Sequence, residues 1–88
     1  MAGDYTSGGP NSVGFLVPFT PGVTTWPTDQ RGAHLTTRMV IVGTAGNINF
    51  TDMYGNTGIA PAIAGDHFWM LNNITSASTT AGGIVLGF

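Results

Sequence analysis

The 88-residue sequence predicts a small all-β domain, namely an antiparallel, jelly-roll-like β-sandwich with an extended N-terminal arm. Several short apolar runs are separated by turn signals at roughly 8–12-residue spacing, which is typical of sandwiches and barrels. Thr and Gly, which disfavour helix interiors, recur along the whole chain. No stretch carries the sustained i, i+3, i+4 apolar pattern of an amphipathic helix.

Residues 1–33 are predicted to form the extended arm and an irregular connection, and residues 34–88 the sandwich core of one domain. The arm carries apolar residues that alternate onto one face: Val13, Phe15, Val17 and Phe19. Pro18 cannot donate to a strand ladder, so this segment is either an edge strand or an arm lying on a neighbour. Turn signals at Pro21-Gly22 and Trp26-Pro27 then predict irregular structure.

The best strand prediction is Arg38-Met39-Val40-Ile41-Val42, whose continuous apolar run indicates burial on both faces. Residues 43–46 read as a Gly-containing turn, and residues 47–53 alternate between polar and apolar side chains. This combination predicts a β-hairpin. An arginine at the start of such a hairpin could pair with Asp52 across it or with an acid on a neighbouring subunit, or it could be a solvated charge of little effect.

The remaining segments alternate between turns and strands. Residues 54–58 predict a turn, and residues 59–63 a weak strand because of Pro61. Residues 67–71 predict a strand with an apolar middle, residues 72–80 a polar connection, and residues 83–88 a final strand.

Charge is scarce in this chain. Only 7% of the residues are charged, against about 25% in an ordinary soluble domain. The full set is Asp4, Asp29, Asp52, Asp66, Arg31 and Arg38. A free monomer normally stays soluble through mixed surface charge. We therefore expect neighbouring molecules to cover much of the surface; the alternative is a monomer with a neutral, hydroxyl-rich exterior.

Composition also argues against several classes of function. Two arginines cannot neutralise a nucleic-acid backbone, so no nucleic-acid partner is expected. No run of 18 apolar residues predicts a membrane span. The first residues lack the basic and apolar regions of a signal peptide, so we expect synthesis in a host cytoplasm. Without Cys, no disulfide or thiolate metal site is available.

Two segments resemble the spike base proteins of tailed phages and gene transfer agents. In residues 35–46, a Thr-Thr-Arg leads a hydrophobic strand that a short Gly-containing turn returns. In residues 75–85, a Thr/Ala/Gly segment precedes a final apolar strand. The resemblance implies a small β-sandwich that forms a ring on a particle and carries a spike or fibre. Residues 15–27 and 59–71 depart from the family pattern.

Six residues are candidates for interface contacts: Phe15, Val17, Phe19, Trp26, Arg38 and Trp69. The first three belong to the apolar arm, which could add to a neighbour's sheet. Phe68 and Trp69 are adjacent, so on a strand one would face the core and the other an interface. Aromatic residues are enriched at interface hot spots. The alternative is that the large aromatics are all buried within one sandwich.

No catalytic, cofactor or metal site is expected. Asp66-His67 is the one adjacent acid–imidazole pair, but neighbouring residues on a strand point to opposite faces, so Asp66 would not orient the ring. A nucleophile such as Thr75 or Ser76 would also have to lie within hydrogen-bond reach. His34, His67 and the aspartates match no metal-ligand spacing.

The sequence thus predicts a virion structural protein, a capsid spike base or head decoration subunit. We expect it to form a pentamer or trimer and to dock on a major capsid or other virion protein, with a spike or fibre protein as a further partner. The alternative is a lectin-like module that stacks Trp26 or Trp69 on sugars. A small hydrolase is the third reading, and the absence of a catalytic constellation opposes it.

Overall fold

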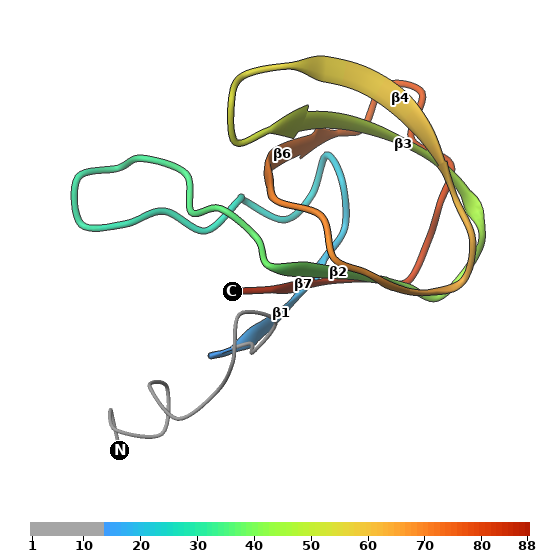
Figure 1. The fold of residues 1–88 in the computed structure, drawn as a ribbon, viewed down its shortest axis with the longest axis horizontal. Helices are drawn as coiled ribbons and strands as arrows, with labels where there is room; N and C mark the ends of the chain where they lie inside the picture. The colour runs from blue at the N-terminus through green and yellow to red at the C-terminus, as the bar shows by residue number, and fades with distance from the viewer. Residues whose placement is uncertain (1–13) are drawn as a thin grey trace.

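The computed structural model describes residues 14–88, which fold into seven β-strands and no helix (Figure 1). Every strand pairing is antiparallel, and the predicted all-β class is confirmed. One sheet has the order β1-β7-β2-β5 and the other the order β4-β3-β6. The strands are β1 (Leu16–Phe19), β2 (Met39–Val42), β3 (Gly46–Asp52), β4 (Thr57–Ala62), β5 (Gly65–His67), β6 (Leu71–Thr75) and β7 (Ile84–Gly87). The jelly-roll detail stays a prediction.

The expected edge strand is β1, which pairs with β7 of its own chain. Phe15 and Phe88 exchange reciprocal backbone hydrogen bonds of 3.3 and 3.0 Å. Because bonded and non-bonded pairs alternate in an antiparallel ladder, Pro18 falls at a position whose nitrogen faces away from β7. The proline therefore costs the sheet no hydrogen bond. The remainder of the predicted arm, including Val13, lies outside the described residues.

The predicted hairpin between residues 38–42 and 47–53 is wrong. Strand β2 pairs with β7 and β5, whereas β3 lies in the other sheet between β4 and β6. The residues between them pair with a distant segment instead: the nitrogens of Gly43 and Thr44 both donate to the carbonyl of Gly82. This contact turns the chain from one sheet to the other. The basis for an Arg38–Asp52 pair across a hairpin is thereby lost.

The true hairpin is formed by β3 and β4, with six residue pairs in register from Gly46↔Ala62 to Thr51↔Thr57. Residues 59–63 were expected to form only a weak strand, yet β4 is six residues long. Pro61 is tolerated because β4 is an edge strand and the register places the proline nitrogen on the outer side. Gly55, with φ at 84°, supplies the left-handed residue that the connecting turn needs.

The strand predicted over 67–71 is split between the two sheets. Strand β5 ends at His67 and β6 begins at Leu71, so the segment 68–70 crosses between the layers. Strand β6 also takes up residues 72–75, which were predicted to be a polar connection. The break arises where Thr37 holds the backbone on either side of Met70, and residues 72–75 are extended because they pair with β3.

The core lies between the sheets and is made of small and branched apolar side chains from both. Its fully buried members include Val40 and Leu86 of one sheet and Ile48 of the other. Phe19 and Trp26 belong to the same cluster. Phe19 and Trp26 of the predicted arm and connection therefore contribute to the sandwich core. The boundary at residue 34 stays a prediction.

Candidate functional site

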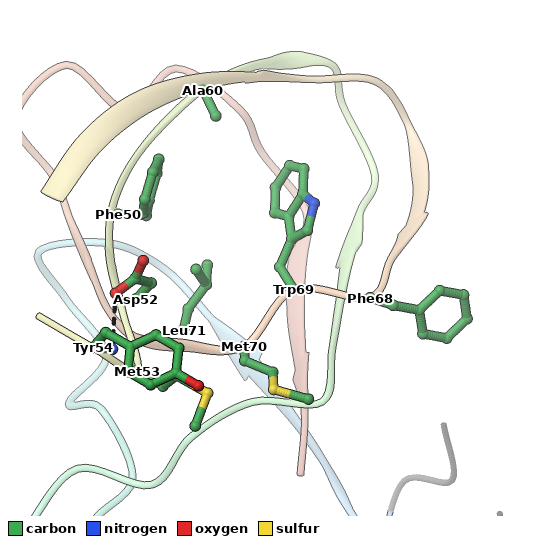
Figure 2. Close-up of a pocket in the computed structure, with 9 residues that line it drawn as sticks. All are labelled: Phe50, Asp52, Met53, Tyr54, Ala60, Phe68, Trp69, Met70 and Leu71. Carbon is green, nitrogen blue, oxygen red and sulfur yellow. Dashed lines mark hydrogen bonds between the residues drawn. The ribbon is translucent and has the colours of Figure 1, made fainter. Parts of the chain in front are cut away.

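A cavity of about 490 Å³ lies beside the β3–β4 turn (Figure 2). Strand β3 and its turn form one wall, and the crossing segment 68–70 forms the other. The lining is apolar apart from one carboxylate and one phenol: Phe50, Asp52, Met53, Tyr54, Ala60, Phe68, Trp69, Met70 and Leu71. An open apolar hollow with few polar groups is the usual form of a binding site.

Trp69 is held in a defined position in this cavity. His67 stacks on its ring, with the two ring centroids 4.3 Å apart and the planes 25° apart. The backbone on either side is fixed by Thr37, whose hydroxyl donates to the Trp69 carbonyl at 2.6 Å and accepts from the Leu71 nitrogen at 2.9 Å. Thr37 itself is fully buried. A buried hydroxyl with both bonds satisfied gives the indole a rigid support.

Phe68 and Trp69 point in different directions, as expected for neighbouring residues in an extended segment. Figure 2 shows Trp69 reaching toward Ala60, whereas the ring of Phe68 is turned outward. Phe68 is 58% exposed and Met70 is 53% exposed. The rim of the cavity on this side is therefore apolar and open to solvent.

Asp52 supplies the charged group of the cavity. Its Oδ1 accepts hydrogen bonds from the backbone nitrogens of Tyr54 and Asn56, at 2.8 and 3.0 Å, and its Oδ2 accepts one from Asn56 Nδ2 at 3.2 Å. Burial acts to raise the pKa of this carboxyl, but the hydrogen bonds from Asn56 and Tyr54 outweigh burial and lower it. The group is therefore ionised at neutral pH.

Among the six predicted interface residues, Trp69 alone lines this cavity. Phe19 and Trp26 are buried in the core, where Trp26 Nε1 donates to the Leu35 carbonyl at 2.8 Å. These two side chains fill the interior and also border a second hollow of about 430 Å³ beside His34. Val17 is half-buried and packs against the same core.

The other two candidates lie at the surface. Phe15 is 47% exposed and stacks on Phe88, with ring centroids 5.2 Å apart. Arg38 is exposed just before β2 and lines a neighbouring hollow with Thr36, Thr37 and Met70. Both residues remain predicted contact positions.

Sequence reasoning missed Phe50, Asp52 and Tyr54 as parts of a common site. One local signal was present: an aspartate followed by Asn and Gly, over residues 52–56, predicts a turn in which the carboxylate accepts backbone hydrogen bonds. No sequence signal indicates that this turn lies beside residues 68–71.

Each histidine has one ring nitrogen beside a backbone carbonyl in the described region. His67 Nε2 lies 2.8 Å from the Ile63 carbonyl, and His34 Nδ1 lies 2.7 Å from the Asn72 carbonyl. Thr75 is on β6, in the sheet opposite His67. Within residues 14–88, no three His, Cys, Asp or Glu side chains gather where they could hold a metal ion.

Comparisons with known proteins give no match: no family model fits the chain, and neither a curated protein nor a solved structure is significantly similar to it. In the part of the chain that the structure describes, no helix is long and apolar enough to cross a membrane.

Proposed function

We propose that this chain is a virion structural protein, a capsid spike base or head decoration subunit that forms a closed ring and docks on the particle. The observation that carries the proposal is a surface rich in large apolar side chains and poor in charge. Exposed examples within residues 14–88 are Phe15, Leu16, Val23, Met53, Tyr54, Ile59, Ile63, Phe68 and Met70. The charged residues in the same region are Asp29, Arg31, Arg38, Asp52 and Asp66.

Three of the four sheet edges favour contacts through side chains over addition of strands. Edge strands β1 and β4 carry Pro18 and Pro61, and in both registers the proline nitrogen faces outward. At these positions the edge offers no hydrogen-bond donor to an incoming strand. Segment 34–37 lies along edge strand β6, because Thr37 and Leu71 bond through their backbones and Thr36 Oγ1 donates to Asn72 Oδ1. We therefore expect copies of the chain to assemble through patches of exposed apolar side chains.

The mass of the purified chain in solution tests this proposal. We expect a discrete closed oligomer, a pentamer or trimer, by native mass spectrometry and sedimentation at micromolar concentrations. We also expect the oligomer to co-sediment with capsids from the virus that encodes it. A highly soluble monomer that binds no particle would overturn the proposal.

A glycan-binding module remains the second candidate, and the cavity favours Trp69 over Trp26 as its stacking residue. Trp26 is only 4% exposed and cannot stack on a sugar, whereas Trp69 lines an open hollow beside the ionised Asp52. Titration calorimetry against a panel of oligosaccharides tests it: this candidate requires saturable binding that Trp69→Ala abolishes. An absence of binding by the folded wild-type protein would remove it.

A further inference from the structure

A second exposed feature of the molecule is the loop between Pro27 and Leu35, which stands clear of both sheets (Figure 1). Its two sides are joined by a bridge between Thr28 and His34 and by a 3.0 Å hydrogen bond from the Leu35 nitrogen to the Pro27 carbonyl. The projecting loop is therefore held by hydrogen bonds between its own two sides.

Hydrogen bonds within the loop close its tip, where Arg31 is exposed. Asp29 Oδ1 accepts hydrogen bonds from the backbone nitrogens of Arg31 and Ala33, at 2.8 and 3.0 Å. Gly32 has a φ of 84°, which a residue with a side chain would adopt only with strain. Within residues 14–88, the hydrogen bond recorded for Arg31 is donated by its backbone and not by its guanidinium. A preorganised tip loses little conformational entropy on binding.

The cavity beside the β3–β4 turn has the chemistry that a guanidinium requires. Arginine stacks on aromatic faces and pairs with carboxylates. Trp69 and Tyr54 supply the aromatic rings, and Asp52 supplies the ionised carboxylate. Asp29 accepts hydrogen bonds within the loop through Oδ1, and Arg31 is the cation that the tip carries. Arg31 does not line the cavity of its own chain.

We propose that the Arg31 loop of one copy of this chain inserts into the Asp52–Trp69 cavity of the next copy. This inference rests on the proposed function, since it names the contact that builds the ring. The contact joins two different surfaces of identical chains, and such head-to-tail contacts close into rings when the rotation between copies divides a full turn. Arg, Trp and Tyr are also the residue types that dominate interface hot spots.

The test uses Arg31→Gln and Asp52→Asn in the full chain. Each substitution removes one charge. In Asp52→Asn the side-chain oxygen still accepts from the backbone nitrogens of Tyr54 and Asn56, and only the 3.2 Å hydrogen bond from Asn56 Nδ2 is lost. Gln30→Ala is the matched control on the same loop. We expect each single variant to weaken subunit association at least about tenfold by sedimentation equilibrium, since charge pairs in interfaces couple this strongly. The subunits of the double variant should associate about as tightly as those of the more weakly associating single variant, because both substitutions remove the same contact.

Mixing the two single variants gives a sharper result. The Asp52→Asn chain keeps its loop and the Arg31→Gln chain keeps its cavity, so a mixture regains one wild-type contact per pair. We expect a heterodimer that does not extend to a ring, at concentrations where each variant alone is monomeric. A purely structural effect of either substitution would not produce this pairing.

The outcomes separate the two proposals. A monomeric wild-type protein would overturn the proposed function itself. A wild-type ring whose association is unchanged by both substitutions would overturn the loop-in-cavity contact alone. So would coupling of Asp52→Asn to Arg38→Gln in place of Arg31→Gln, because another cation would then occupy the cavity. A cavity that binds a glycan while the ring stays intact would likewise overturn it.

Discussion

The two tryptophans occupy contrasting environments in one small sandwich. Trp26 is enclosed by Phe19 and Phe88, which contact its ring edge-on with centroids 5.3 and 6.2 Å away, and its nitrogen is bonded to the Leu35 carbonyl. Trp69 is half-buried, is supported on one side by His67 and lines an open cavity. A large aromatic side chain is thus enclosed in the core in one region and borders an open cavity in the other.

The difference teaches how a chain of this size divides its apolar residues. A small domain has a limited core, so each enclosed aromatic contributes much of the stability. Apolar side chains left outside that core, such as Phe68 and Met70, gain by being covered in an assembly. The rigid position of Trp69 means that such an assembly would not have to order it first.

The largest expected effect is that of Trp26→Ala. Removing an enclosed Trp leaves a void and an unpaired carbonyl at Leu35, and such changes cost about 3–5 kcal/mol. Domains of this kind have total stabilities of about 5–15 kcal/mol, so we expect a mostly lost or strongly lowered thermal transition by circular dichroism.

Trp69→Ala is the matched comparison. Its ring borders a cavity that is already open, so we expect less than half of the stability loss caused by Trp26→Ala. The same variant should lose subunit association measured by sedimentation. Equal losses of stability from the two substitutions would contradict the division between an enclosed and an exposed tryptophan.

Thr37→Val has the next effect in size. The substitution keeps the shape of the side chain but leaves the Trp69 carbonyl and the Leu71 nitrogen without their buried partner. An unsatisfied buried group costs about 1–3 kcal/mol. We expect that loss in urea unfolding, together with a changed near-ultraviolet signal from Trp69.

Thr37→Ser is the control for this variant because it keeps the hydroxyl. It should be more stable than Thr37→Val although it lacks a methyl group. The reverse order would show that packing of the methyl, and not the pair of hydrogen bonds, holds the segment.

The smallest expected effect concerns pH. Hydrogen bonds from Asn56 and Tyr54 lower the pKa of Asp52 in the folded chain, against the opposing effect of burial. A carboxyl with a lower pKa in the folded state adds stability above its unfolded pKa, and that stability is lost as pH falls through the folded pKa. We expect Asp52→Asn to flatten the acid side of the stability profile measured by urea unfolding. An unchanged profile would contradict the role of the turn.

Much of the fold was predictable from local pattern. Alternation and turn residues located β1, β2, β3 and β7 to within a few residues. Pro18 indicated an edge strand or an arm on a neighbour, and the edge strand is observed. The separation of β2 and β3 into different sheets was not predictable, because a Gly-containing turn between two apolar runs is typical of a hairpin. The hairpin does not form because residues 43–44 bond instead to residue 82, which is far away in the sequence.

The candidate site was predictable only in part. Trp69 was singled out as an aromatic in an apolar segment, but the cavity also needs Phe50, Asp52 and Tyr54 from the β3–β4 hairpin. The two parts meet because Thr37, some thirty residues away in sequence, binds the backbone at 69 and 71. The spacing of residues along the sequence does not predict such a long-range contact.

By itself the sequence determined the all-β class, the scarcity of charge and the aromatic residues available for contact, since these depend on composition and on the two-residue period of strands. Only the tertiary structure decided which aromatic is enclosed, which lines a cavity and which acid lies beside it. Those outcomes depend on strand order and on long-range hydrogen bonds, which are set by the packing of the whole chain.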